Sequence, residues 1–158
     1  MATHAPAEPG PTDAPAPQRI EPPVTETSQP FWDATREKRF LMQWCVACDK
    51  PIWFPREICP RCMGSTLEWR PSAGFGVVYT LTVEHKPQNP AIGGGAPYVV
   101  ALIDLDEGAR MMSNVFGCPP EHVYVGMPVR VAWDPLSDGR NVPVFEPRPE
   151  DLANGAPS

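Results

Sequence analysis

The chain has 158 residues, 42% of them hydrophobic, which is enough for one ordinary domain with a small appendage. Its formal net charge is −6. From residue 30 onward there are 12 Lys and Arg and 15 Asp and Glu, so this part of the chain has a net charge of −3. Because an acidic body repels phosphate backbones, this balance weighs against nucleic-acid binding.

The first 29 residues have the composition of an unfolded segment. Eight of the 23 prolines fall within the first 30 residues, and large apolar side chains are almost absent there. Such a segment buries too little surface to offset its ordering entropy, so residues 1–29 are predicted to form a disordered Pro/Ala-rich tail. The segment lacks the apolar centre of a secretory signal, and the chain has no run of 18 apolar residues. We therefore expect a cytoplasmic protein.

Residues 30–70 are predicted to form a short helix followed by a metal-binding ribbon. Pro30 suits the first turn of a helix over residues 30–40. A helix of this length is marginal on its own in water, so its aromatic side chains must pack on something. Phe31, Trp32 and Phe40 are therefore expected to contact either the chain's own ribbon or a partner subunit.

The strongest motif is a pair of Cys-x-x-Cys sequences with ten residues between them. Two residues between cysteines allow a tight turn to aim both thiolates at one ion, and two such turns complete a tetrahedron. A small hairpin over residues 51–55 is expected to bring them together. Zinc is favoured over iron, and a site with four protein ligands is structural rather than catalytic. The predicted metal ligands are Cys45, Cys48, Cys59 and Cys62.

Residues 71–147 have the pattern of a five-stranded OB-type barrel. Short β-branched or aromatic segments alternate with turn residues, and a helical turn over residues 119–125 follows the third strand. In the first strand, apolar residues at 77, 79, 81 and 83 are expected to share one face. A long loop over residues 86–97 is a candidate functional loop, and residues 148–158 are expected to be a tail. The predicted strands are 77–85, 98–105, 110–116, 129–133 and 142–146.

No known catalytic constellation is present in this sequence. Only His85 and His122 are histidines of the part predicted to fold, and Cys118 is a lone thiol. Either histidine could act as a general base and Cys118 as a nucleophile, but the pattern favours solvated strand-end or turn residues for the histidines and a small apolar side chain for Cys118. We therefore predict that the chain has no catalytic residues of its own.

The residues together resemble a family of zinc-ribbon and OB-fold accessory proteins, a class of domains of unknown function. Its members partner thiolases and thiolase-like lipid-transfer or aldolase proteins. The similarity spans about residues 31–145. The matching motifs are Phe31-Trp32, the two cysteine pairs, Phe54-Pro55-Arg56, Leu67-Glu68-Trp69, Gly74-x-Gly76-x-Val78-Tyr79 and Pro97-Tyr98-Val99-Val100-Ala101-Leu102.

The resemblance implies a non-catalytic subunit of a thiolase or aldolase complex that acts on a CoA thioester. In such complexes the partner carries the catalytic residues, the subunits form a hetero-oligomer with two copies of each, and acyl-CoA lies near the interface. Large aromatics at Phe31, Trp32, Trp44 and Trp53 would fit such an interface if they are exposed. Two alternatives remain open: a module that binds single-stranded nucleic acid, and a stand-alone protein that binds or hydrolyses acyl-CoA.

Overall fold

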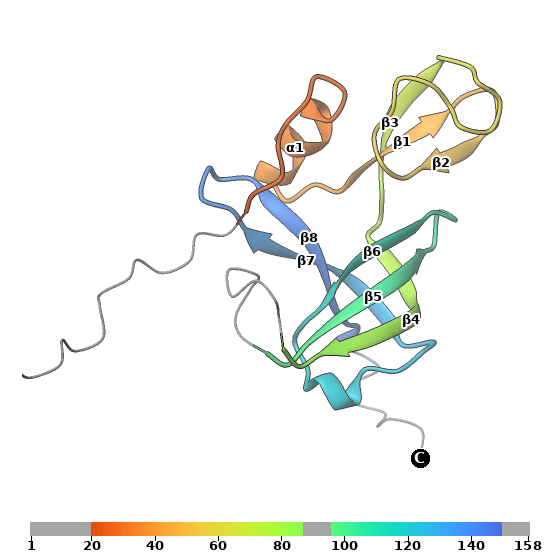
Figure 1. Cartoon of the computed structure of the whole chain (residues 1–158). Helices are drawn as coiled ribbons and strands as arrows, with labels where there is room; N and C mark the ends of the chain where they lie inside the picture. The colour runs from red at the N-terminus through yellow and green to blue at the C-terminus, as the bar shows by residue number, and fades with distance from the viewer. Residues whose placement is uncertain (1–19, 87–95, 150–158) are drawn as a thin grey trace, which may run out of the picture.

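The computed structural model describes residues 20–86 and 96–149 (Figure 1). Within these ranges the chain forms a short helix, a three-stranded ribbon sheet and a closed five-stranded barrel, which confirms the predicted fold class. No helix in the described part of the chain is long and apolar enough to cross a bilayer. The elements are α1 (Gln29–Arg36), β1 (Leu41–Cys45), β2 (Lys50–Ile52), β3 (Leu67–Pro71), β4 (Phe75–Glu84), β5 (Tyr98–Leu105), β6 (Arg110–Val115), the 3-10 turn η1 (Pro120–His122), β7 (Pro128–Pro135) and β8 (Asn141–Pro147).

The ribbon sheet has β1 at its centre. Strand β2 pairs antiparallel with one edge of β1, and β3 pairs antiparallel with the other edge. Figure 1 shows this sheet beside α1 and next to the barrel, into which the chain passes directly from β3 to β4. The predicted hairpin over residues 51–55 is wrong, because β2 pairs with β1 and the chain bends after Ile52.

The barrel closes in the order β4-β5-β6-β8-β7. All neighbouring strands are antiparallel except β6 and β8, which meet in parallel where Val115 lies opposite Phe145. Alternate residues of β5 point into the core, as expected for a strand with one buried face. The five predicted strands are confirmed to within two residues at each end. The fully buried side chains of the barrel core are Val78, Val99, Ile103, Val129 and Phe145.

The helix is shorter than the predicted range of 30–40. It ends at Arg36, and Lys38 then adopts a positive φ of 54°. The backbone N–H groups of Glu37, Lys38 and Arg39 bond back to carbonyls of the last turn, which closes the helix before Phe40. The carbonyl of Phe40 instead accepts the N–H of Ser72, so this residue already belongs to the ribbon.

A β-bulge overturns the predicted alternation in β4. The register between β4 and β5 shifts between Val78 and Thr80, which leaves Tyr79 as the extra residue. An extra residue in one strand reverses the faces of the side chains on its two sides. Val77 and Tyr79 therefore face solvent, with Tyr79 49% exposed, while Leu81 and Val83 pack against the core.

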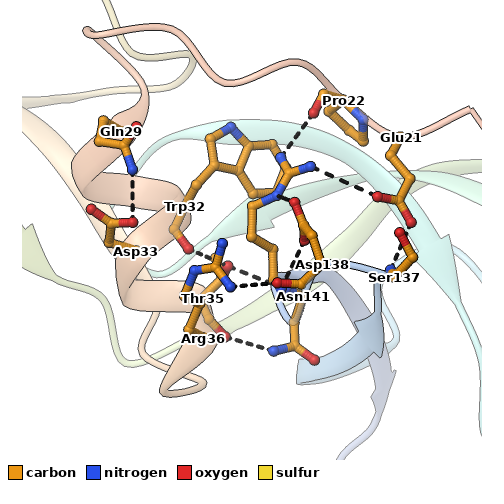
Figure 2. A network of polar contacts seen from close by, with 11 residues as sticks. Glu21, Pro22, Gln29, Trp32, Asp33, Thr35, Arg36, Ser137, Asp138 and Asn141 are labelled. Atoms are coloured by element: carbon orange, nitrogen blue, oxygen red, sulfur yellow. Dashed lines mark hydrogen bonds and ion pairs between the residues drawn. The ribbon is translucent and has the colours of Figure 1, made fainter.

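Glu21 and Pro22 contact the barrel, although they fall within the range predicted as a disordered tail (Figure 2). Arg140 Nη1 donates to the carbonyl of Pro22 at 2.8 Å, and the Ser137 N–H donates to the Glu21 carboxylate at 2.7 Å. The packed body therefore begins before the predicted boundary at residue 29. Residues 1–19 and 150–158 lie outside the described part, so the prediction of tails there stays a prediction.

Aromatic rings fill the space between α1, the ribbon and the barrel. Phe31 meets Trp32, Phe40 and Trp53 in edge-to-face geometry, with ring centres 5.0, 6.4 and 5.8 Å apart. Phe40 also meets Trp133 of the barrel at 6.4 Å. Such edge-to-face pairs stabilise beyond the area that they bury. The expectation that these rings pack on the chain's own ribbon is therefore confirmed, and the alternative of an exposed interface at Phe31 and Trp32 is wrong, because both side chains are buried.

Candidate metal centre

The first Cys-x-x-Cys sequence forms the turn between β1 and β2. Cys45 is the last residue of β1, and Cys48 lies in the turn before β2 begins at Lys50. Asp49, which follows Cys48, has a positive φ of 49° that reverses the chain. Local sterics disfavour this conformation for most residues, but aspartate tolerates it better than most.

The second Cys-x-x-Cys sequence repeats this geometry in a loop between β2 and β3. Met63, which follows Cys62, has a positive φ of 59°. The Met63 N–H donates to the Cys59 carbonyl at 2.9 Å, and the Cys59 N–H donates to the Gly64 carbonyl at 2.9 Å. These bonds close a tight turn around the two sulfur atoms. The Arg61 N–H points at the Cys59 sulfur, 3.4 Å away.

The two turns bring the four sulfur atoms together, as the spacing predicted. All four Sγ atoms lie within 4.8 Å of one another. The Cys45 and Cys62 sulfurs are 3.7 Å apart, and those of Cys48 and Cys59 are 3.9 Å apart. A zinc ion bonded to four sulfurs at about 2.3 Å in a tetrahedron separates them by roughly 3.8 Å, so the cluster has the size that zinc requires.

The thiol pKa values of two of the cysteines are shifted in opposite directions. A hydrogen bond to the Cys62 thiol raises the pKa of Cys48 to about 12. Backbone N–H groups of Cys62 and Arg61 lower the pKa of Cys59 to about 6. Thiols in mutual contact lose their protons one after another because their anions repel. A divalent cation removes this repulsion, so the donor set fits a metal that prefers thiolates.

A buried glutamine braces the ribbon, and the sequence analysis missed it. The side-chain amide of Gln43 donates to the Arg56 carbonyl at 2.9 Å and accepts the Arg56 N–H at 2.7 Å. Gln43 lies in β1, two residues before the first cysteine ligand candidate, so these bonds fasten the loop between the two turns. In the sequence, the only indication of this role of Gln43 was that a polar residue stands between apolar neighbours in a strand.

The candidate catalytic residues of the sequence are scattered. His85 follows the end of β4 and His122 lies in η1, and both side chains are exposed. Cys118 is half-buried, and burial, followed by the charge of Glu121, raises the pKa of its thiol. A raised pKa lowers the fraction of reactive thiolate, so Cys118 behaves as a small apolar side chain. Most of the predicted loop over residues 86–97 lies outside the described residues.

Comparison with known proteins places this architecture in a family. Residues 32–69 match the model described as "ChsH2, rubredoxin-like zinc ribbon domain", and residues 69–134 match "ChsH2, C-terminal OB-fold domain". A solved chain described as "Ltp2-ChsH2(DUF35) aldolase" superposes with a TM-score of 0.71 and 34% sequence identity, over 80% of this chain and 98% of that chain. The chain belongs to the ChsH2/DUF35 family. The resemblance noted from its motifs is confirmed.

Two ChsH2/DUF35 relatives extend the comparison. "Probable enoyl-CoA hydratase alpha subunit" of Thermomonospora curvata is 35% identical over 133 residues, which are 83% of this chain and 41% of the relative. "DUF35 domain-containing scaffold protein" of Methanocaldococcus jannaschii is 43% identical over 91 residues, which are 56% of this chain and 63% of the relative. This chain therefore spans about two fifths of the first relative and less than two thirds of the second.

Proposed function

We propose that this ChsH2/DUF35 protein is a non-catalytic subunit that binds a thiolase or thiolase-like aldolase. One observation carries the proposal: the alignment covers 98% of a ChsH2/DUF35 chain whose name joins it to Ltp2 in an aldolase. The name "scaffold protein" of another relative supports the same role. In this proposal the reacting groups belong to the partner, and this chain shapes the complex.

The four cysteines hold a structural zinc ion in this proposal. The ligands are Cys45, Cys48, Cys59 and Cys62, whose sulfur atoms gather within 4.8 Å. Four thiolates fill a tetrahedral zinc, which leaves no position for water or substrate. The ion would supply folding free energy to a ribbon that has only a small apolar core around Cys45, Ile52 and Cys59.

The substrate of the complex is proposed to be an acyl-CoA, from the degradation of a fatty acid, a steroid side chain or an aromatic acid. The name of the Thermomonospora curvata relative includes enoyl-CoA, which supports a CoA thioester. We further propose a cytoplasmic hetero-oligomer with two copies of each subunit. The acyl-CoA would then bind near the interface between the two kinds of subunit.

Co-expression with a thiolase-like protein from the same genome tests this function. Size-exclusion chromatography with light scattering should give one complex, and its mass gives the number of copies. The partner purified alone should be unstable or less active towards acyl-CoA than the complex. Two proteins that elute separately, with a fully active partner, would contradict the proposal.

A further inference from the structure

An apolar groove lies where the segment before helix α1 meets the ribbon and the barrel. Its volume is about 330 Å³, and no charged side chain of the described residues lines it. The walls come from the segment before α1, from α1 itself, from the loop after β2 and from strands β6 and β8. The lining includes Pro22, Pro23, Trp53, Phe54, Met112 and Pro143.

Two large apolar side chains of this groove are exposed. Phe54 is 60% exposed, and Met112 is 66% exposed. The Phe54 ring packs on Trp53 with the ring centres 5.7 Å apart, so the core supports it from one side. Phe54 also has a positive φ of 42°, which is costly for an aromatic residue and is typical of sites that hold a ligand. The groove therefore favours an apolar occupant.

The segment before α1 is anchored at the edge of this groove. The Ser137 N–H donates to the Glu21 carboxylate at 2.7 Å, and Figure 2 shows the two residues together. Arg140 Nη1 donates to the Pro22 carbonyl at 2.8 Å. Pro22 and Pro23 line the groove themselves. The residues that precede Glu21 therefore join the packed body at the edge of the groove.

A short sequence before this anchor has the composition of a ligand for such a groove. Residues 14–17 read Ala-Pro-Ala-Pro and carry no charge. Proline-rich segments favour the polyproline II conformation, and they dock into grooves lined by aromatic rings. Pro17 is five residues from Pro22 in the sequence, so it stays within roughly 18 Å of Pro22. A tether this short gives a millimolar effective concentration, at which a weak contact is enough.

We propose that residues 14–17 bind in the groove of their own chain and cover Phe54 and Met112. The alternating prolines pack on the apolar rims, and the anchor at Glu21 and Pro22 supplies the short tether. This cover shields an apolar surface that would otherwise promote association with other proteins. The inference is independent of the proposed function, because it concerns contacts within this chain alone.

Methyl NMR on the zinc-loaded protein tests the contact. The full chain is compared with a chain that begins at Ile20, both carrying ¹³C-labelled methionine methyl groups. The Met112 methyl signal should shift on truncation, because this side chain loses its cover. The Met63 methyl group is the matched control: it is 71% exposed, it lies in the second cysteine turn outside the groove, and its signal should not move.

A synthetic peptide of residues 10–20 tests the same contact between separate molecules. Added to the truncated chain at millimolar concentration, it should reverse the shift that truncation causes. The peptide with Pro15→Gly and Pro17→Gly should not. Phe54→Ala in the truncated chain should weaken peptide binding about fivefold or more, whereas Phe75→Ala should leave it unchanged, because Phe75 is an exposed ring outside the groove.

Three results would overturn the inference. The first is no change at Met112 on truncation, or an equal change at Met63. The second is a Met112 shift that grows with protein concentration in both chains while light scattering detects dimers, which would assign the groove to a second copy. The third is a Met112 signal that moves only when the thiolase-like partner is added, which would assign the groove to that partner and leave the proposed function standing.

Discussion

The guanidinium of Arg140 lies 4.8 Å from the centre of the Trp32 indole ring, and this stack joins the last hairpin of the barrel to helix α1. Arg140 is only 5% exposed and also bonds to Asp138 at 2.6 Å and to the Pro22 carbonyl at 2.8 Å. One side chain thus connects the segment at Pro22, helix α1 and the turn before β8.

Arg140→Lys should lower the free energy of unfolding by about 1–2 kcal/mol. Lysine keeps the charge but loses the planar stack and the fork of donors. Urea denaturation of the zinc-loaded protein measures the difference. Arg39→Lys is the control, because Arg39 pairs with Glu37 on the surface and should cost less than about 0.5 kcal/mol. Equal losses of unfolding free energy in the two variants would show that the buried contacts of Arg140 add no stability.

Cys59→Ser should abolish zinc binding and unfold the ribbon. The Cys59 sulfur is fully buried and receives a backbone N–H, so a hydroxyl cannot replace it as a thiolate ligand. Elemental analysis should give one zinc per wild-type chain and almost none in the variant. Cys118→Ser should keep its zinc, since Cys118 lies outside the cluster. A folded Cys59 variant that still holds one zinc would show that the proposed ligand set is wrong.

Gly76→Ala should destabilise the barrel by about 2 kcal/mol through overpacking. A Cβ at Gly76 would lie 2.5 Å from the Asp104 carbonyl oxygen, and neither strand can move because β4 pairs on both sides there. Gly108→Ala is the comparison: its φ of +91° is strained for alanine, but its Cβ meets no atom within 4 Å. It should cost about 1 kcal/mol. Thermal unfolding that ranks the two variants in the opposite order would contradict the packing argument.

Asp138 should contribute to the loss of stability in acid. The backbone N–H and the guanidinium of Arg140 hold the pKa of the Asp138 carboxyl below its usual range. A depressed pKa in the folded state adds stability that is present above the unfolded-state pKa, near about 4, and is lost as the pH falls through the lower folded-state pKa. Below about pH 4 the unfolding free energy of the wild type should therefore fall more steeply than that of Asp138→Asn. Parallel pH profiles from urea denaturation would exclude this contribution.

The sequence predicted what depends on local spacing. The Cys-x-x-Cys pairs led directly to the sulfur cluster, and turn residues between β-branched segments located the five barrel strands. Features that depend on tertiary contacts were missed. The bulge at Tyr79 is set by the pairing of β4 with β5, and the carbonyl of Pro22 accepts from Arg140, which lies 118 residues away in the sequence.

The environment of the helix aromatics was left open between the chain's own ribbon and a partner subunit, and the structure decides for the first. A short helix needs something to cover its apolar face. Trp53 of the ribbon meets Phe31, and Trp133 of the barrel meets Phe40, so the cover comes from within the chain itself. Composition alone could not show that these rings converge, since the residues that join them come from three separate elements.

The central claim is that this chain supports chemistry carried out by another protein. Its most direct test is the rate of acyl-CoA turnover in four samples. Two are single proteins: the purified zinc-loaded chain, and a thiolase-like partner inactivated by substitution of a catalytic residue. The other two are complexes of the wild-type chain, one with the wild-type partner and one with the inactivated partner. We predict turnover only where the wild-type partner is present. Turnover of acyl-CoA by this chain alone, or by its complex with the inactivated partner, would contradict the claim.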